Sequence, residues 1–214
     1  MVRTGARAHA LQQQLTRTGL SPAPAAPSAP RLDTLPEVAR TAVSAVYEAL
    51  GGARPMRAVR PGAWDLAFAG ELVVELDEEL HFNRYRHLTL QFPWATELPW
   101  RDTYLGYCTG QEQRCLDAGR WGKRWTSPSC EAMFGPATAA GDLDGAGAPR
   151  WKQRALYDAV KDIAAVHSST VRLARLSVWD TVGHVVLGDA LSTGSPIDPD
   201  RLRDLVGRRT TATP

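Results

Sequence analysis

The chain has 214 residues, of which 43% are hydrophobic and 22% are charged, and it carries a net charge of +2. This size supports one substantial core, with one domain as the default and two short ones as the alternative. No apolar stretch approaches the length of a membrane span, and the low net charge excludes attraction to a polyanion by overall charge, so any basic surface has to be local.

The cysteines and the N-terminus bear on cellular location. Arginines near the N-terminus are not followed by an apolar run, which argues against a secretory signal. The three cysteines, Cys108, Cys115 and Cys130, are an odd count without a Cys-x-x-Cys pair. This pattern argues against a disulfide scaffold and disfavours a structural zinc site, whose ligands usually come in close pairs. We therefore expect buried thiols and a cytoplasmic protein without a membrane partner.

Composition along the chain predicts the domain boundaries. Residues 5–18 fit a short polar helix, and residues 21–30 are rich in proline, alanine and serine. We therefore expect a mobile N-terminal segment and linker over 1–32. A single domain is expected over 33–208, with a disordered tail over 209–214.

The first helix of this domain is the clearest one and covers residues 34–50. Thr34 and Glu37 have the spacing of a capping box, and Gly51–Gly52 ends the helical periodicity.

A hairpin follows, with two extended runs around Ala69–Gly70–Glu71. Opposed residues of an antiparallel hairpin share a face, and faces alternate along each strand. A connection of three residues opposes Phe68 to Leu72 and gathers all the large apolar side chains on one face, whereas a two-residue turn would put Asp65 among them. Burial therefore selects the longer connection, because a slip by one residue exposes the whole apolar face. The apolar face then holds Trp64, Leu66, Phe68, Leu72, Val74 and Leu76, and the opposite face holds Asp65, Glu75 and Asp77.

Further elements are expected downstream: a helix over 101–119, a loop over 135–150, an amphipathic helix over 151–167, a strand over 170–182 and a short capped helix at 198–209. This order of helices and strands predicts an α/β or α+β fold.

The carboxylates on one sheet face suggest a metal site. Neighbouring carboxylates repel each other, and burying them requires a counter-charge. Mg²⁺ supplies such a charge and prefers oxygen ligands. It can activate water and neutralise the charge that builds up on a phosphate oxygen. Arg84 and Arg86, which follow this stretch, would then face a phosphate backbone.

The segment "RPGAWDLAFAGELVVELDEELHF" (60–82) resembles the core of the PD-(D/E)XK nuclease superfamily, and within it the very-short-patch (Vsr-like) endonucleases. The resemblance implies a restriction-endonuclease-like core, with a mixed central sheet flanked by helices, and a Mg²⁺-dependent nuclease that acts on DNA rather than RNA. By the same resemblance, Asp65 and Glu75 would hold the metal and Asp77 would be a ligand or lie just behind the ligands. His81 would be a general base or a phosphate contact. The superfamily lysine is absent, and Asp77 stands in its place.

Each of these assignments has an alternative. Asp65 and Glu75 also fit ordinary charges at strand ends, and His81 fits a structural histidine. "RWGKRW" (120–125) interleaves two tryptophans with Arg120, Lys123 and Arg124, a combination that either binds nucleic acid or packs in a core. At the level of the whole protein, the alternative is a degenerate member of the same fold that binds nucleic acid or protein without catalysis, or an unrelated domain with surface acids. The amino-acid sequence does not specify an oligomeric state.

Overall fold

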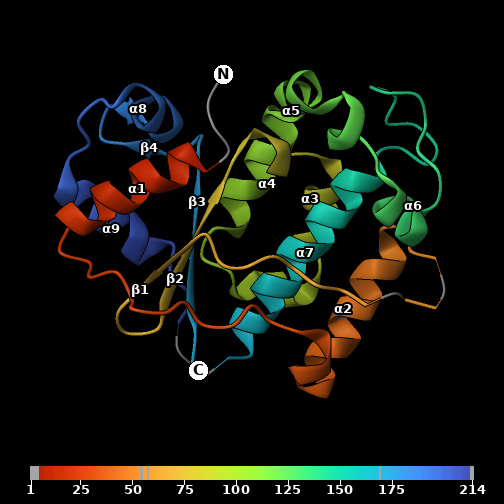
Figure 1. Cartoon of the computed structure of the whole chain (residues 1–214), viewed down its shortest axis with the longest axis horizontal. Helices are drawn as coiled ribbons and strands as arrows, with labels where there is room; N and C mark the ends of the chain where they lie inside the picture. The colour runs from red at the N-terminus through yellow and green to blue at the C-terminus, as the bar shows by residue number, and fades with distance from the viewer. Residues whose placement is uncertain (1–4, 54, 57, 169, 213–214) are drawn as a thin grey trace. The chain divides into compact units, whose positions relative to one another are not determined.

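A computed structural model describes residues 5–53, 55–56, 58–168 and 170–212 and shows a mixed α/β protein (Figure 1). The described residues group into two compact units. The first unit takes in Met1–Ser28, Ala63–Glu78 and Ser168–Pro214, and the second takes in Ala29–Gly62 and Glu79–His167. The chain therefore leaves the first unit after the predicted hairpin and returns to it for the later strand.

The first unit is built on a three-stranded sheet of order β1-β2-β3. Strands β1 (Leu66–Phe68) and β2 (Leu72–Asp77) are antiparallel, and β3 (Arg172–Ser177) is parallel to β2. Phe68 pairs with Leu72, which confirms the predicted three-residue connection. Gly70 and Glu71 take positive φ angles of 73° and 62°, the left-handed conformation that lets so short a connection reverse the chain.

The apolar face of this sheet is the one predicted from the register. It is covered by α1 (Ala6–Arg17), α8 (Leu187–Thr193) and α9 (Pro199–Arg208), whose apolar side chains form one core with it. Asp198 caps α9 as expected, because its side chain accepts hydrogen bonds from the backbone N–H groups of Asp200 and Arg201. A small hairpin of β4 (Thr181–Val182) and β5 (Val185–Val186) completes the unit.

Residues expected to be a mobile segment and linker contribute to this core. The side chains of Leu11 and Leu15 are fully buried, and they lie four residues apart on one face of α1. The proline-rich stretch runs beside β1, where Ala23 donates its N–H to the Ala67 carbonyl at 2.9 Å. Two buried leucines are enough to anchor a polar helix, but they are too few to stand out as a periodic pattern. Part of the predicted tail is also held, since the Thr211 N–H donates to the Leu173 carbonyl at 2.9 Å.

The second unit is helical over its described residues. Its long helix α7 (Pro149–Val166) confirms the helix predicted over 151–167, and α2 (Glu37–Ala49), α3 (Arg84–Thr89) and α6 (Pro128–Phe134) pack beside it (Figure 1). The core of the unit forms along α7 around Trp151, Leu156 and Val160. The loop predicted over 135–150 is confirmed up to Ala148, after which α7 begins.

Three local predictions differ from the structure. The capping box of Thr34 is wrong, because a 3₁₀ turn, η1 (Leu32–Thr34), precedes α2, and Pro36 occupies the N-cap without a side-chain bond. The helix predicted over 101–119 is divided into α4 (Arg101–Gly110) and α5 (Glu112–Gly119), with Gln111 between them. The strand predicted over 170–182 divides at a turn, in which the Asp180 carboxylate accepts the N–H of Ser177 at 2.8 Å.

Among the described residues, no helix has both the length and the apolar character needed to cross a membrane.

Candidate functional site

Asp65 and Glu75 lie side by side at the end of the hairpin, as the register predicts. The backbone N–H of Asp65 donates to Glu75 Oε1 at 3.1 Å, and the backbone N–H of Leu76 donates to Asp65 Oδ2 at 2.9 Å. Each carboxylate therefore extends the antiparallel pairing beyond Leu66, the last residue paired by backbone. Asp65 is exposed to solvent, whereas Glu75 is buried within the strand. The result is one exposed and one buried carboxylate next to each other.

Asp77 is held differently, by a buried arginine. Arg175 on β3 donates from Nη1 to both carboxylate oxygens of Asp77, at 2.7 and 2.9 Å. Both side chains are buried, with exposed fractions of 0% for Arg175 and 2% for Asp77. The parallel register explains the contact, because Arg175 pairs with Glu75 and so lies on the face that carries both acids. Arg175 thus supplies a counter-charge for Asp77, which the nuclease resemblance makes a metal ligand or a residue just behind the ligands.

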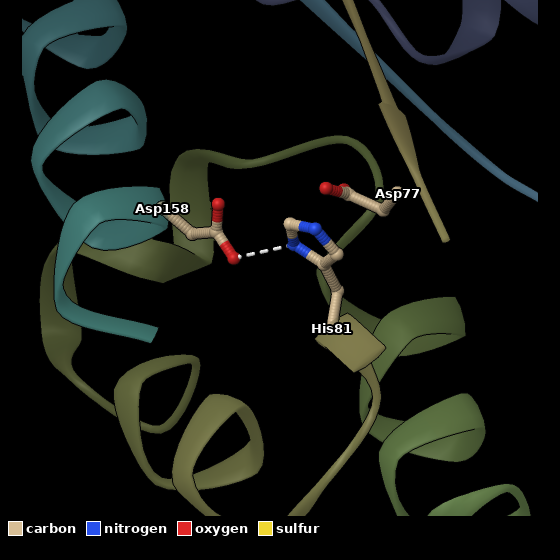
Figure 2. A group of neighbouring side chains, drawn as sticks. All are labelled: Asp77, His81 and Asp158. Atoms are coloured by element: carbon tan, nitrogen blue, oxygen red, sulfur yellow. Dashed lines mark hydrogen bonds and ion pairs between the residues drawn. The ribbon is translucent and has the colours of Figure 1, made fainter. Parts of the chain in front are cut away.

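His81 forms a pair with Asp158 inside the second unit (Figure 2). His81 ends the 3₁₀ turn η2 (Glu79–His81), and its Nδ1 lies 2.8 Å from Asp158 Oδ2 on α7. Asp158 is almost fully buried, whereas 23% of the His81 side chain is exposed. An ionised Asp158 can only accept a hydrogen bond, so His81 donates to it from Nδ1–H. This bond fixes the ring, and the lone pair of a neutral His81 is then on Nε2. Asp77, also drawn in Figure 2, belongs to the first unit.

Arg154 lies one helical turn before Asp158 on α7, and it binds the 3₁₀ turn η2 that carries His81. Its Nη1 donates to the Leu80 carbonyl at 3.3 Å, beside His81 in the sequence. Burial lowers the pKa of Arg154, and the neighbouring Asp158 carboxylate opposes this by favouring the charged guanidinium. Gly119 permits the close packing of this turn, since a Cβ there would lie 2.6 Å from Leu80 Cδ2 and 2.8 Å from Trp151 Cζ2.

The basic residues that follow the hairpin are bound within the second unit. Arg86 is 1% exposed and donates to Asp162 on α7 at 2.6 Å, so it neutralises a buried acid and does not lie on the surface. Arg84 is half exposed and binds both carboxylate oxygens of Glu112, at 3.0 and 2.9 Å. The bonds to Glu112 raise the pKa of Arg84. Partial burial alone would raise the pKa of Glu112, but the hydrogen bonds from Arg84 outweigh it and lower that pKa.

The "RWGKRW" segment divides into an exposed and a buried part. Trp121 is 58% exposed, and the Arg120 guanidinium lies 4.7 Å from the centre of its ring. Lys123 and Arg124 are also exposed, on the short 3₁₀ turn η4 (Gly122–Arg124). Trp125 is buried against Trp151, with ring centroids 5.2 Å apart. Only the first tryptophan is therefore available for stacking on a base.

The three cysteines are buried thiols, as predicted. Burial raises the pKa of Cys115 to about 12, which keeps this thiol protonated and unreactive.

Asp158 and Arg175 are the two functional candidates that sequence reasoning missed. Asp158 stands beside the apolar stripe of its helix, where an acid is usually solvated, so the pattern carries no signal for it. For Arg175 the sequence does carry a signal, because an arginine that interrupts an apolar strand predicts a buried carboxylate partner.

Comparison with known proteins identifies a family but no function. A family of unknown function, DUF7255, matches residues 45–193. The chain belongs to this family. No curated protein and no solved structure matches the chain. The matched range includes the hairpin acids, Arg175 and the His81–Asp158 pair, so these features lie within the part that defines the family.

Proposed function

We propose that this protein is a Mg²⁺-dependent nuclease with a restriction-endonuclease-like core, in which Asp65 and Glu75 hold the metal. The observation that carries the proposal is the reciprocal arrangement of Asp65 and Glu75, in which each carboxylate accepts a backbone N–H bond from the opposite strand segment. Oxygen donors of this kind suit Mg²⁺, and a second charge of the same sign beside a buried Glu75 favours a cation. Asp77 is left out of the ligand set, because Arg175 already binds both of its oxygens.

In this proposal each residue has a definite task. Asp65 and Glu75 supply negative oxygen ligands that backbone N–H groups keep in place. Mg²⁺ held by these two residues would supply positive charge against a phosphate oxygen and would make water more acidic. Within the second unit, His81 is oriented by Asp158 and would serve as a general base or a phosphate contact through Nε2. The exposed Trp121, with Arg120 over its ring, offers a stacking surface for an unpaired base.

Cleavage assays test the proposal with duplex, mismatched and single-stranded DNA and with RNA, in the presence of Mg²⁺ or Mn²⁺. We expect Asp65→Asn and Glu75→Gln to reduce cleavage by at least about a hundredfold, the range in which loss of a positioned catalytic group falls. Asp189→Asn is the matched control, because Asp189 is an exposed acid on α8 of the same unit. Full activity in Asp65→Asn would remove the metal assignment.

A measurement without turnover tests the metal separately. Ligand binding stabilises the folded state by RT ln(1 + [L]/Kd), so saturating Mg²⁺ should raise the melting temperature of the wild-type protein. The rise should disappear in Asp65→Asn and persist in Asp189→Asn. An equal rise in all three proteins would show that Mg²⁺ binds elsewhere.

The second candidate is a non-catalytic member of the same fold that binds nucleic acid. The Asp77–Arg175 pair favours it, because the position of the superfamily lysine holds an acid neutralised from within the protein. This candidate predicts nucleic-acid binding without metal and no cleavage of any substrate. Binding that Mg²⁺ leaves unchanged, together with absent cleavage, would decide for it.

A further inference from the structure

An open pocket of about 440 Å³ lies in the second unit, and its lining contains none of the candidate site residues. Its wall comes from the segment before α2, from α2 itself and from the loop that precedes the hairpin. The lining residues are Arg31, Leu32, Asp33, Arg40, Ala58, Val59 and Arg60. Three of these seven side chains are arginines and one is an acid, so the lining carries a formal charge of +2.

The partners of these arginines show which charges remain uncompensated. Arg31 binds Asp33 through two hydrogen bonds, at 3.2 and 3.0 Å, and the bond from Arg31 lowers the pKa of Asp33. Arg40 donates from Nη1 to the backbone carbonyl of Leu35 at 2.6 Å, which is a neutral acceptor. Within the described part of the chain, no carboxylate pairs with the guanidinium of Arg40 or Arg60. Two guanidiniums of the lining therefore lack an anionic partner.

Val59, next to Arg60, is buried in the core of the unit and so holds this part of the lining in place. Arg40 and Arg60 are themselves exposed, so a ligand from solvent can reach both guanidiniums. The one acid of the lining, Asp33, is already bound to Arg31. This arrangement suits an anion.

The charge and the volume of the pocket limit the chemical class of its ligand. The two uncompensated guanidiniums match a dianion better than a single carboxylate, and a phosphate monoester carries about −1.5 to −2 charges at neutral pH. The guanidinium fork also matches phosphate oxygens in pairs. Leu32, Ala58 and Val59 give the pocket an apolar portion, and its volume falls in the range of about 300–1,000 Å³ that is typical of small-molecule sites. Inorganic phosphate would leave this apolar portion uncovered.

We propose that this pocket binds a phosphate monoester through the guanidiniums of Arg40 and Arg60, with the organic part of the ligand against the apolar lining residues. The chemistry is shared by a free mononucleotide and by the phosphorylated end of a nucleic-acid strand. The proposal does not depend on nuclease activity, because it uses none of the residues assigned to catalysis.

Titration calorimetry with adenosine 5′-monophosphate tests the site, with adenosine and inorganic phosphate as comparison ligands. The monophosphate should bind more tightly than either. Arg60→Gln should weaken its binding by at least about tenfold, which corresponds to about 1.4 kcal/mol. Arg60 is the preferred position because its side chain makes no hydrogen bond or ion pair with the residues that the structure describes, whereas Arg40→Gln also removes the bond to Leu35. Arg201→Gln is the matched control, an exposed arginine on α9 of the first unit.

The outcomes separate the sources and the alternatives. Comparable binding of a 5′-phosphorylated and a 5′-hydroxyl oligonucleotide, or of adenosine and its monophosphate, would overturn the proposal. Binding only of the phosphorylated oligonucleotide and of the monophosphate supports both sources, and binding of the monophosphate alone supports a free small ligand. Circular dichroism of Arg60→Gln checks that the fold is kept. Failure here leaves the Asp65→Asn cleavage result unaffected, so the two proposals stand or fall separately.

Discussion

Replacing Arg175 with methionine tests the buried ion pair on which the polar face of the sheet depends. The substitution keeps an unbranched side chain but removes the guanidinium that binds both oxygens of Asp77. Removing one partner of a buried pair typically destabilises a protein by about 3–5 kcal/mol, because the remaining charge is left in a medium of low polarity. For a chain of this size, each kcal/mol lowers the melting temperature by about 2–4 °C. We therefore expect Arg175→Met to melt about 6–20 °C below the wild type.

A double-mutant cycle separates the pair from the packing around it. The free energy of unfolding is measured by urea titration for Arg175→Met, for Asp77→Leu and for the double variant. If the two charges compensate each other, the double variant is more stable than Arg175→Met alone, because no buried carboxylate remains without its guanidinium. Additive losses, or a loss below about 1 kcal/mol in Arg175→Met, would refute the reasoning, since either result means that the guanidinium is not the main counter-charge of Asp77.

Four further outcomes follow from the described contacts. Leu15→Ala should destabilise the protein by about 2–5 kcal/mol in urea unfolding, since Leu15 is fully buried; a loss near zero would mean that the N-terminal helix is mobile, as its composition suggests. Gly119→Ala should destabilise by about 1–3 kcal/mol in the same assay, because a Cβ would come within 2.8 Å of a rigid indole ring; the neighbouring exposed position Asp117→Ala is the control. Cys115, whose pKa is raised to about 12, should stay unmodified by a thiol reagent at pH 8 until the protein is unfolded, and rapid modification would show that the thiol is accessible. Arg84 lowers the pKa of Glu112 in the folded state, so the stability that this pair contributes is present above the unfolded pKa of about 4.3 and is lost as pH falls through the folded value. In Glu112→Gln the free energy of unfolding should fall less steeply over this acidic range. An unchanged dependence of stability on pH would contradict the assignment.

Local pattern was sufficient for the elements that bury one face. The hairpin register followed from apolar alternation alone, because a slip by one residue would expose every large side chain of β1 and β2. The helix α7 was predictable for the same reason, since its stripe repeats at helical spacing. From this register the juxtaposition of Asp65 and Glu75 also follows, and the structure places them together.

Local pattern was not sufficient where a few residues decide the outcome. The N-terminal segment reads as polar and proline-rich, yet Leu11 and Leu15 hold it in a core formed with residues more than a hundred positions away. Such an arrangement depends on long-range packing, which composition over a short window does not register.

Side-chain alternation and burial leave a single register for the hairpin, so the register could be derived without the fold. The partner of each charge, in contrast, depends on how distant parts of the chain pack. Arg175 reaches Asp77 across a parallel pairing whose connection includes the segment Glu79–His167 of the second unit. Asp158 reaches His81 from a helix position 77 residues further along the chain. A buried charge needs a counter-charge wherever the fold supplies one. The sequence shows that a buried acid requires a counter-charge, but only the folded chain shows which residue supplies it.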